Sequence, residues 1–271
     1  MNKYLNKINR NTALGKFLSR QKLVLFALLT SLISATAKDN ADAKQLFENS
    51  AQKLSIKNVH LVLDMETSDG KGNRKTKTLG VSFAEFDQAK KTLIEFLAPE
   101  NVKGTKILTN DYKNKKGIIE IYMPATGKVQ KIRANQRNMR ILGSEIPIDQ
   151  FRAVVEDGLN YTLTGEEKIN GINCYRIKMQ KTDEKGYEVA FISVEKEQLL
   201  KIEQYDNQNR MTGMTELSDY MEVNNSEHKF YPKKICVKNL KNKKISVMEI
   251  KQVNFLKNAD IRDFQLSPTA S

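Results

Sequence analysis

The stretch Gly117–Phe151, GIIEIYMPATGKVQKIRANQRNMRILGSEIPIDQF, decides how the fold is predicted. It opens with an alternation in which Ile119, Ile121 and Met123 fall on one face of an extended chain, which is typical of a β-strand. Pro124–Gly127 then supplies the residue types of a tight reversal. These observations predict a strand that ends in a turn, with a second strand returning beside it.

The returning strand is expected at Lys128–Arg133, and a basic segment without strand or helix periodicity follows it. We interpret Gly117–Ile132 as the wall of a sheet and Ala134–Phe151 as a gate at its mouth. Ser144 lies in this gate beside a single glycine, so the second glycine of a nucleophile elbow is missing. Its hydroxyl group is therefore expected to bond to the backbone and not to act as a nucleophile.

Upstream of the strands, the sequence predicts one amphipathic helix. Asp39 or Asn40 can cap its N-terminus, because their side chains accept hydrogen bonds from free backbone amides. Such a helix needs a sheet to cover with its apolar side. The residues on that side are Ala43, Leu46, Phe47, Ala51 and Leu54.

From Lys57 onward the chain alternates between apolar and polar residues, with turn-like separators such as Asn170-Gly171. This regular spacing favours an antiparallel meander over βαβ units. A meander of about eleven strands tends to curl or close instead of lying flat. The fold class is therefore mainly β with a few helices, and residues 38–271 are expected to form a single domain.

Several predicted strands are apolar on both faces, among them Lys91–Ala98, Ile118–Met123 and Glu188–Val194. A sheet with one solvated face would show alternation there. Two explanations stay open at this point. Either helices cover part of both faces, or apolar side chains line an interior cavity.

The N-terminus is typical of an export signal. Basic residues up to Lys22 precede the apolar run Leu23–Ile33, and Ala35-Thr36-Ala37 fits a signal-peptidase cleavage site. The run is shorter than the ~20 residues that a membrane-spanning helix needs. A cleaved signal over 1–37 and a periplasmic location are therefore favoured over an uncleaved inner-membrane anchor.

The formal charge of +13 needs correction for this signal, since six of the 45 Lys and Arg residues lie within it and no acid does. The mature chain then carries 39 basic against 32 acidic side chains, a net charge of +7. The basic run from Lys128 to Arg140 lacks the interleaved aromatic residues of a nucleic-acid surface. A solvated face, or contact with anionic headgroups or an acidic partner, is favoured, and no nucleic-acid partner is expected.

Residues for catalysis or metal binding are sparse. His60 and His228 are isolated, and no Cys/His cluster has the spacing of metal ligands. Cys174 and Cys236 could pair in an oxidising compartment or serve as small buried hydrophobes. We expect no enzyme, no cofactor and no metal.

Five motifs, in order along about 40–268, resemble those of the outer-membrane lipoprotein-sorting proteins, the LolA-like family, and more narrowly an uncharacterised exported branch. The chain departs from the family pattern at Ile141-Leu142, where Phe-Met is usual, and at Ile146–Ile148, which replaces a more aromatic run. The five motifs are Glu95–Leu108, Ile121–Phe151, Gly171–Ile177, Lys201–Asp206 and Ala259–Leu266.

The resemblance implies a curled antiparallel sheet that forms an incomplete, half-open β-barrel, with helices as a lid over an apolar cavity. It also implies a monomeric periplasmic carrier for the acyl chains of lipoproteins, or for another lipid. Its partners would be an inner-membrane transporter or an outer-membrane acceptor. The alternative is a non-catalytic cell-envelope module that uses the same fold as a docking surface.

If the cavity exists, strand parity and the gate hypothesis together predict its lining. A slip of one residue would exchange the two faces of a strand. The candidate ligand-binding residues are Leu61, Leu63, Leu93, Ile119, Ile121, Met139, Leu142 and Phe151.

Overall fold

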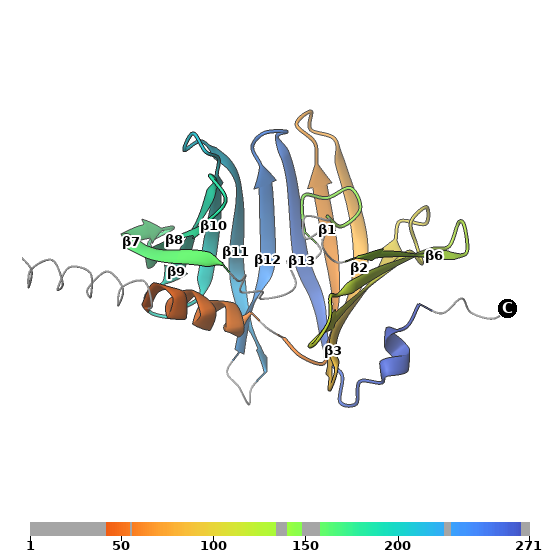
Figure 1. Cartoon of the computed structure of the whole chain (residues 1–271). Coiled ribbons are helices and arrows are strands. Elements are labelled where there is room, and N and C mark those ends of the chain that lie inside the picture. The colour runs from red at the N-terminus through yellow and green to blue at the C-terminus, as the bar shows by residue number, and fades with distance from the viewer. Residues whose placement is uncertain (1–41, 55, 134–139, 148–157, 225–228, 267–271) are drawn as a thin grey trace, which may run out of the picture.

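Figure 1 shows the protein as a computed structural model that describes residues 42–54, 56–133, 140–147, 158–224 and 229–266. In this part of the chain, one α-helix, 42–53, precedes thirteen strands and a closing 3-10 helix. The elements are β1 (Val59–Ser68), β2 (Arg74–Phe86), β3 (Ala89–Ala98), β4 (Lys106–Tyr112), β5 (Ile118–Met123), β6 (Lys128–Arg133), β7 (Leu159–Ile169), β8 (Ile172–Lys181), β9 (Tyr187–Ser193), β10 (Leu199–Tyr205), β11 (Met211–Asn224), β12 (Lys229–Asn239), β13 (Lys244–Phe255) and η2 (Ile261–Phe264).

All thirteen strands form one antiparallel sheet in the order β6-β5-β4-β3-β2-β1-β13-β12-β11-β10-β9-β8-β7. Consecutive strands are neighbours in the sheet except β6 and β7, which lie at its opposite edges, and the first and last strands pair in the middle. The sheet curls strongly around an open front (Figure 1) and does not close, because β6 and β7 remain its two edges. The predicted curled, half-open antiparallel sheet is confirmed.

Strand β1 shows why these residues form the inner wall. Val59, Leu61, Leu63 and Met65 alternate with polar residues, and none of the four is more than 1% exposed. They pack in the largest apolar cluster together with residues of β2, β3, β12 and β13. The predicted division of this strand into an apolar and a polar face is therefore correct.

The helix 42–53 lies across the concave side of the sheet at the β7–β11 end (Figure 1). Its predicted apolar side is buried there, with Ala43, Phe47 and Ala51 at most 8% exposed. The Phe47 ring lies 5.5 Å from the ring of Tyr161 on β7. The lid of the described residues is thus a single helix that covers one end of the sheet.

The outer face of β2–β4 has its own cover. The segment after β13 folds back along it, and η2 places Phe264, 2% exposed, against Leu93, Leu108 and Phe86. The Phe264 and Phe86 rings meet edge to face at 5.7 Å. Chain packing on the outer face therefore explains why β3 is apolar on both faces.

The turn at Asn170-Gly171 joins β7 to β8 as the sequence predicted. Both residues have positive φ, 48° and 86°, as a two-residue type I′ hairpin requires. Among the described residues, no helix has the length and apolar character needed to cross a membrane. The signal segment 1–37 lies outside the described residues and stays a prediction, as does the single-domain division.

Candidate functional site

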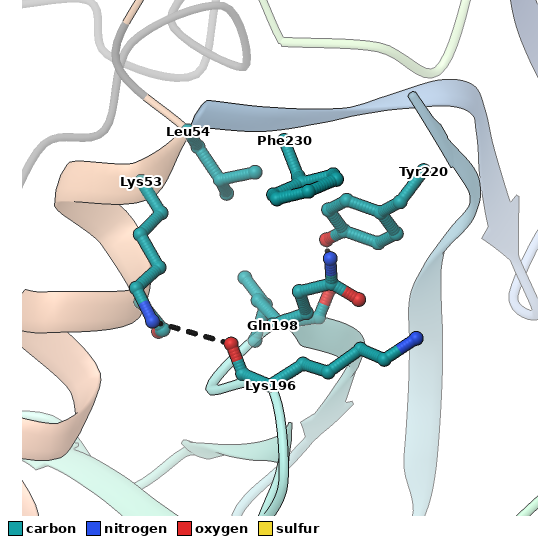
Figure 2. A pocket seen from close by; sticks show the side chains of 8 residues that line it. Lys53, Leu54, Lys196, Gln198, Tyr220 and Phe230 are labelled. Carbon is teal, nitrogen blue, oxygen red and sulfur yellow. Dashed lines mark hydrogen bonds between the residues drawn. The ribbon is translucent and has the colours of Figure 1, made fainter. Parts of the chain in front are cut away.

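A pocket of about 360 Å³ lies where the C-terminal end of the helix 42–53 meets β10, β11 and β12 (Figure 2). Its volume is in the lower part of the range for small-molecule sites. The elements that form it are far apart in sequence, so the curled sheet and its helix build it together. The lining residues are Ser50, Lys53, Leu54, Lys196, Gln198, Leu199, Tyr220 and Phe230.

The inner wall of this pocket is apolar and aromatic. Leu54 and Leu199 belong to the cluster beneath the helix, and the Phe230 side chain is 40% exposed. The Tyr220 hydroxyl donates a hydrogen bond to the carbonyl oxygen of Leu199. Burial raises the pKa of Tyr220, so this hydroxyl stays a neutral donor.

A break in strand alternation brings Tyr220 to the pocket. Leu217 and Tyr220 pack in the same cluster, although they are an odd number of residues apart on β11. Asp219 between them has a φ of +54°, outside the extended region, which interrupts the regular alternation of side chains there. Strict period-2 reasoning would have assigned Tyr220 to the opposite face.

Cationic and polar side chains form the rim. The Lys53 ammonium group lies 2.7 Å from the Glu197 carboxylate and donates to the carbonyl oxygen of Lys196 at 3.2 Å. Lys196 itself is exposed. The pocket thus combines an apolar wall with a polar mouth, as an amphiphilic ligand requires.

None of the six predicted lining residues that the structure describes lines this pocket. Leu61, Leu63, Ile119 and Ile121 come together as predicted, but they pack against other side chains in the largest apolar cluster. Their side chains are at most 8% exposed. Their predicted role as ligand contacts is not tested by this placement.

The two other described candidates, Leu93 and Leu142, lie apart from this cluster. Leu93 lies on the outer face against the Phe264 cluster, while its neighbours Ile94 and Phe96 occupy the inner core. Leu142 is 41% exposed. Met139 and Phe151 lie outside the described residues, as does most of the predicted gate.

The described part of the gate, 140–147, packs against the inner face of the sheet and contributes Ile141 and Ile146, both fully buried, to the core. The Ser144 hydroxyl donates to the carbonyl oxygen of Ile141 at 2.8 Å and accepts from the Ile146 amide at 3.1 Å. The prediction that Ser144 bonds the backbone is confirmed.

Glu145 fastens this segment to the β12–β13 hairpin. Its carboxylate is 5% exposed, pairs with Arg140, and accepts from the side-chain amides of Asn239 at 2.8 Å and Asn242 at 3.2 Å. Its own backbone amide donates to the Ser246 hydroxyl at 2.8 Å. A buried carboxylate needs such a set of donors to offset its lost hydration.

The described residues show few reactive groups. No three His, Cys, Asp or Glu side chains gather there as a metal site would require. Cys174 and Cys236 are both free. Burial raises the pKa of the Cys174 thiol, which makes it a small core residue and not a reactive thiolate.

A family model described only as an uncharacterised protein matches residues 88–267. The chain belongs to this family. The matched residues run from the β2–β3 turn through the described C-terminal segment, so they include β10, β11, β12 and the turn before β10, which line the pocket. Residues of the helix, including Lys53 and Leu54, precede the match. A comparison with the curated proteins finds no match.

Three solved structures share this family member's fold. A DUF1329 family protein from Desulfovibrio piger is 18% identical, with a TM-score of 0.72 over 84% of this chain and 98% of its own. A putative outer membrane lipoprotein-sorting protein domain from Vibrio parahaemolyticus is 16% identical, with a TM-score of 0.72 over 83% and 97%. A LolA superfamily protein from Nitrosomonas europaea is 15% identical, with a TM-score of 0.62 over 82% and 97%. The resemblance to LolA-like proteins is thereby confirmed at the level of the fold.

Proposed function

We propose that this protein is a non-catalytic periplasmic carrier that holds the acyl chains of lipoproteins, or another lipid, during transport towards the outer membrane. The observation that carries the proposal is the pocket between the helix and β10–β12, with its apolar wall and polar mouth. The fold supports it, because one structure of similar fold is a putative lipoprotein-sorting domain.

The physical reason for such a carrier is the cost of exposing hydrocarbon to water. Each methylene group left in water costs about 0.8 kcal/mol. A pocket that covers an alkyl chain removes this cost while the chain crosses an aqueous compartment. The half-exposed Phe230 ring fits this role, since a ligand would cover the part that now faces water.

Native mass spectrometry of protein purified from a periplasmic extract tests the proposal. We expect co-purifying lipid. An apolar fluorescent probe should bind to the delipidated protein. Phe230→Ala should raise the Kd of the probe about tenfold, because the variant loses the free energy gained when the probe buries the aromatic ring.

Phe255→Ala is the matched control, because Phe255 is also an exposed phenylalanine, 52% accessible, but lies outside the pocket. It should leave probe binding unchanged. Absence of both lipid and probe binding would overturn the carrier proposal and favour a docking module. Equal loss in both variants would place the binding elsewhere.

A further inference from the structure

We infer that the pocket takes a single-chain lipid anion, with its acidic head at Lys196 and its tail against Leu54, Leu199 and Phe230. The inference rests on the proposed carrier function and names its ligand class. It follows from the charge at the mouth, the polarity gradient across the pocket and the volume available.

The charge at the mouth is the first step. Lys53 and Glu197 form an ion pair and neutralise one another. Lys196 is exposed and forms no ion pair with any described residue, so its ammonium group is available to a ligand at the mouth. An ammonium group on a flexible stem is a good partner for a carboxylate or phosphate, and it contributes nothing to the binding of a neutral hydrocarbon.

The polarity gradient is the second step. Figure 2 shows the Lys196 side chain running along one side of the pocket, with the Gln198 amide pointing inward towards Tyr220. Leu54 and Phe230 lie on the other side. A ligand that satisfies both sides has one charged or polar end and one apolar end.

The volume is the third step. About 360 Å³ lies near the lower limit of small-molecule sites. This space matches one alkyl chain, so of the ligands that the carrier proposal allows we select a single-chain lipid over the several chains of a lipoprotein. A single-chain anion such as a fatty acid or an acidic lysophospholipid meets the charge, gradient and volume together.

Isothermal titration calorimetry with ligands of equal chain length tests the inference. Decanoate, decanol and decyltrimethylammonium carry a negative, a neutral and a positive head on ten-carbon chains, and inorganic phosphate represents a head without a tail. We expect decanoate to bind about three- to fivefold more tightly than decanol, the range for an exposed ion pair. The advantage should shrink as salt screens the charge.

Lys196→Gln should abolish the advantage of decanoate and leave decanol binding unchanged, while Lys196→Arg should keep most of it. Lys185→Gln, at an exposed lysine of the β8–β9 turn, is the matched control and should have no effect. Equal binding of decanoate and decanol in the unmodified protein overturns the inference and leaves the carrier proposal standing. Phosphate that binds as tightly as decanoate also overturns it, in favour of a free-anion site. If no alkyl ligand binds and no lipid co-purifies, both proposals fail.

Discussion

Replacing Glu145 with alanine removes the carboxylate that holds residues 140–147 against the β12–β13 hairpin. The variant leaves the side-chain amides of Asn239 and Asn242 without their acceptor and Arg140 without its partner. The core residues Ile141 and Ile146 depend on the same attachment, because they flank Glu145 on both sides.

The expected loss can be estimated from these contacts. A hydrogen bond to a charged group contributes about 1.5–3 kcal/mol, but bonds to one carboxylate are not additive. The Arg140 side chain is 46% exposed and regains water when its partner is removed. We therefore expect a loss of about 2–4 kcal/mol for Glu145→Ala. Glu145→Gln keeps the volume and one acceptor, and should lose about half as much.

Urea unfolding followed by circular dichroism measures the global effect. Hydrogen exchange measures the local effect at the Ile141 and Ile146 amides, which bond to the Ile146 carbonyl and the Ser144 hydroxyl. Both amides should exchange faster in Glu145→Ala. The control is Glu100→Ala, because Glu100 is 87% exposed and its ion pair with Lys103 should contribute less than about 0.5 kcal/mol. If Glu145→Ala and Glu100→Ala unfold at the same urea concentration, the carboxylate does not hold the segment as argued.

Three further perturbations test other parts of the fold. Gly171→Ala at a φ of +86°, with open space around the added methyl group, should cost about 1 kcal/mol from the backbone alone; an unchanged melting temperature contradicts this. Phe264→Ala should cost about 3 kcal/mol and expose the C-terminal segment to limited proteolysis, whereas Ile261→Ala, 47% exposed, should do neither. Burial and then the hydrogen bond to Glu203 raise the pKa of Tyr205 to about 12. The stability that neutral Tyr205 contributes is therefore complete below about pH 10 and is lost as the pH rises through about 12. Absorbance titration should show a phenolate step there that Tyr205→Phe removes; a step that persists in this variant refutes the assignment.

Local patterns in the sequence were sufficient for most of the fold. The alternation in β1 and the stripe from Ala43 to Leu54 predicted their buried faces correctly, because burial of one face is a property of the element itself. The Asn170-Gly171 turn was equally readable, since few residue types accept a positive φ.

The pocket could not be predicted because its wall is assembled over long distances in sequence. Leu54, Leu199, Tyr220 and Phe230 come from four separate segments, and each looks like an ordinary core residue. Tyr220 was further hidden by the interrupted alternation at Asp219, which has a positive φ. Leu93 could not be assigned to a face for a different reason. Strand β3 is apolar on both faces, and only packing against Phe264, which is distant in sequence, places Leu93 on the outer one.

The pairing of β1 with β13 has a consequence for the order in which the protein folds. This ladder aligns Val59 with Phe255, so it joins residues from nearly opposite ends of the chain. The remaining ladders are local and divide into two separate meanders, β1–β6 and β7–β13, that only this seam unites. Contacts between residues so far apart in sequence form late, and they lower the folding rate. A chain that lacks β13 should form two separate half-sheets, because β1 and β12 would then have unpaired edges. The complete sheet should therefore form only after nearly the whole chain has been synthesised.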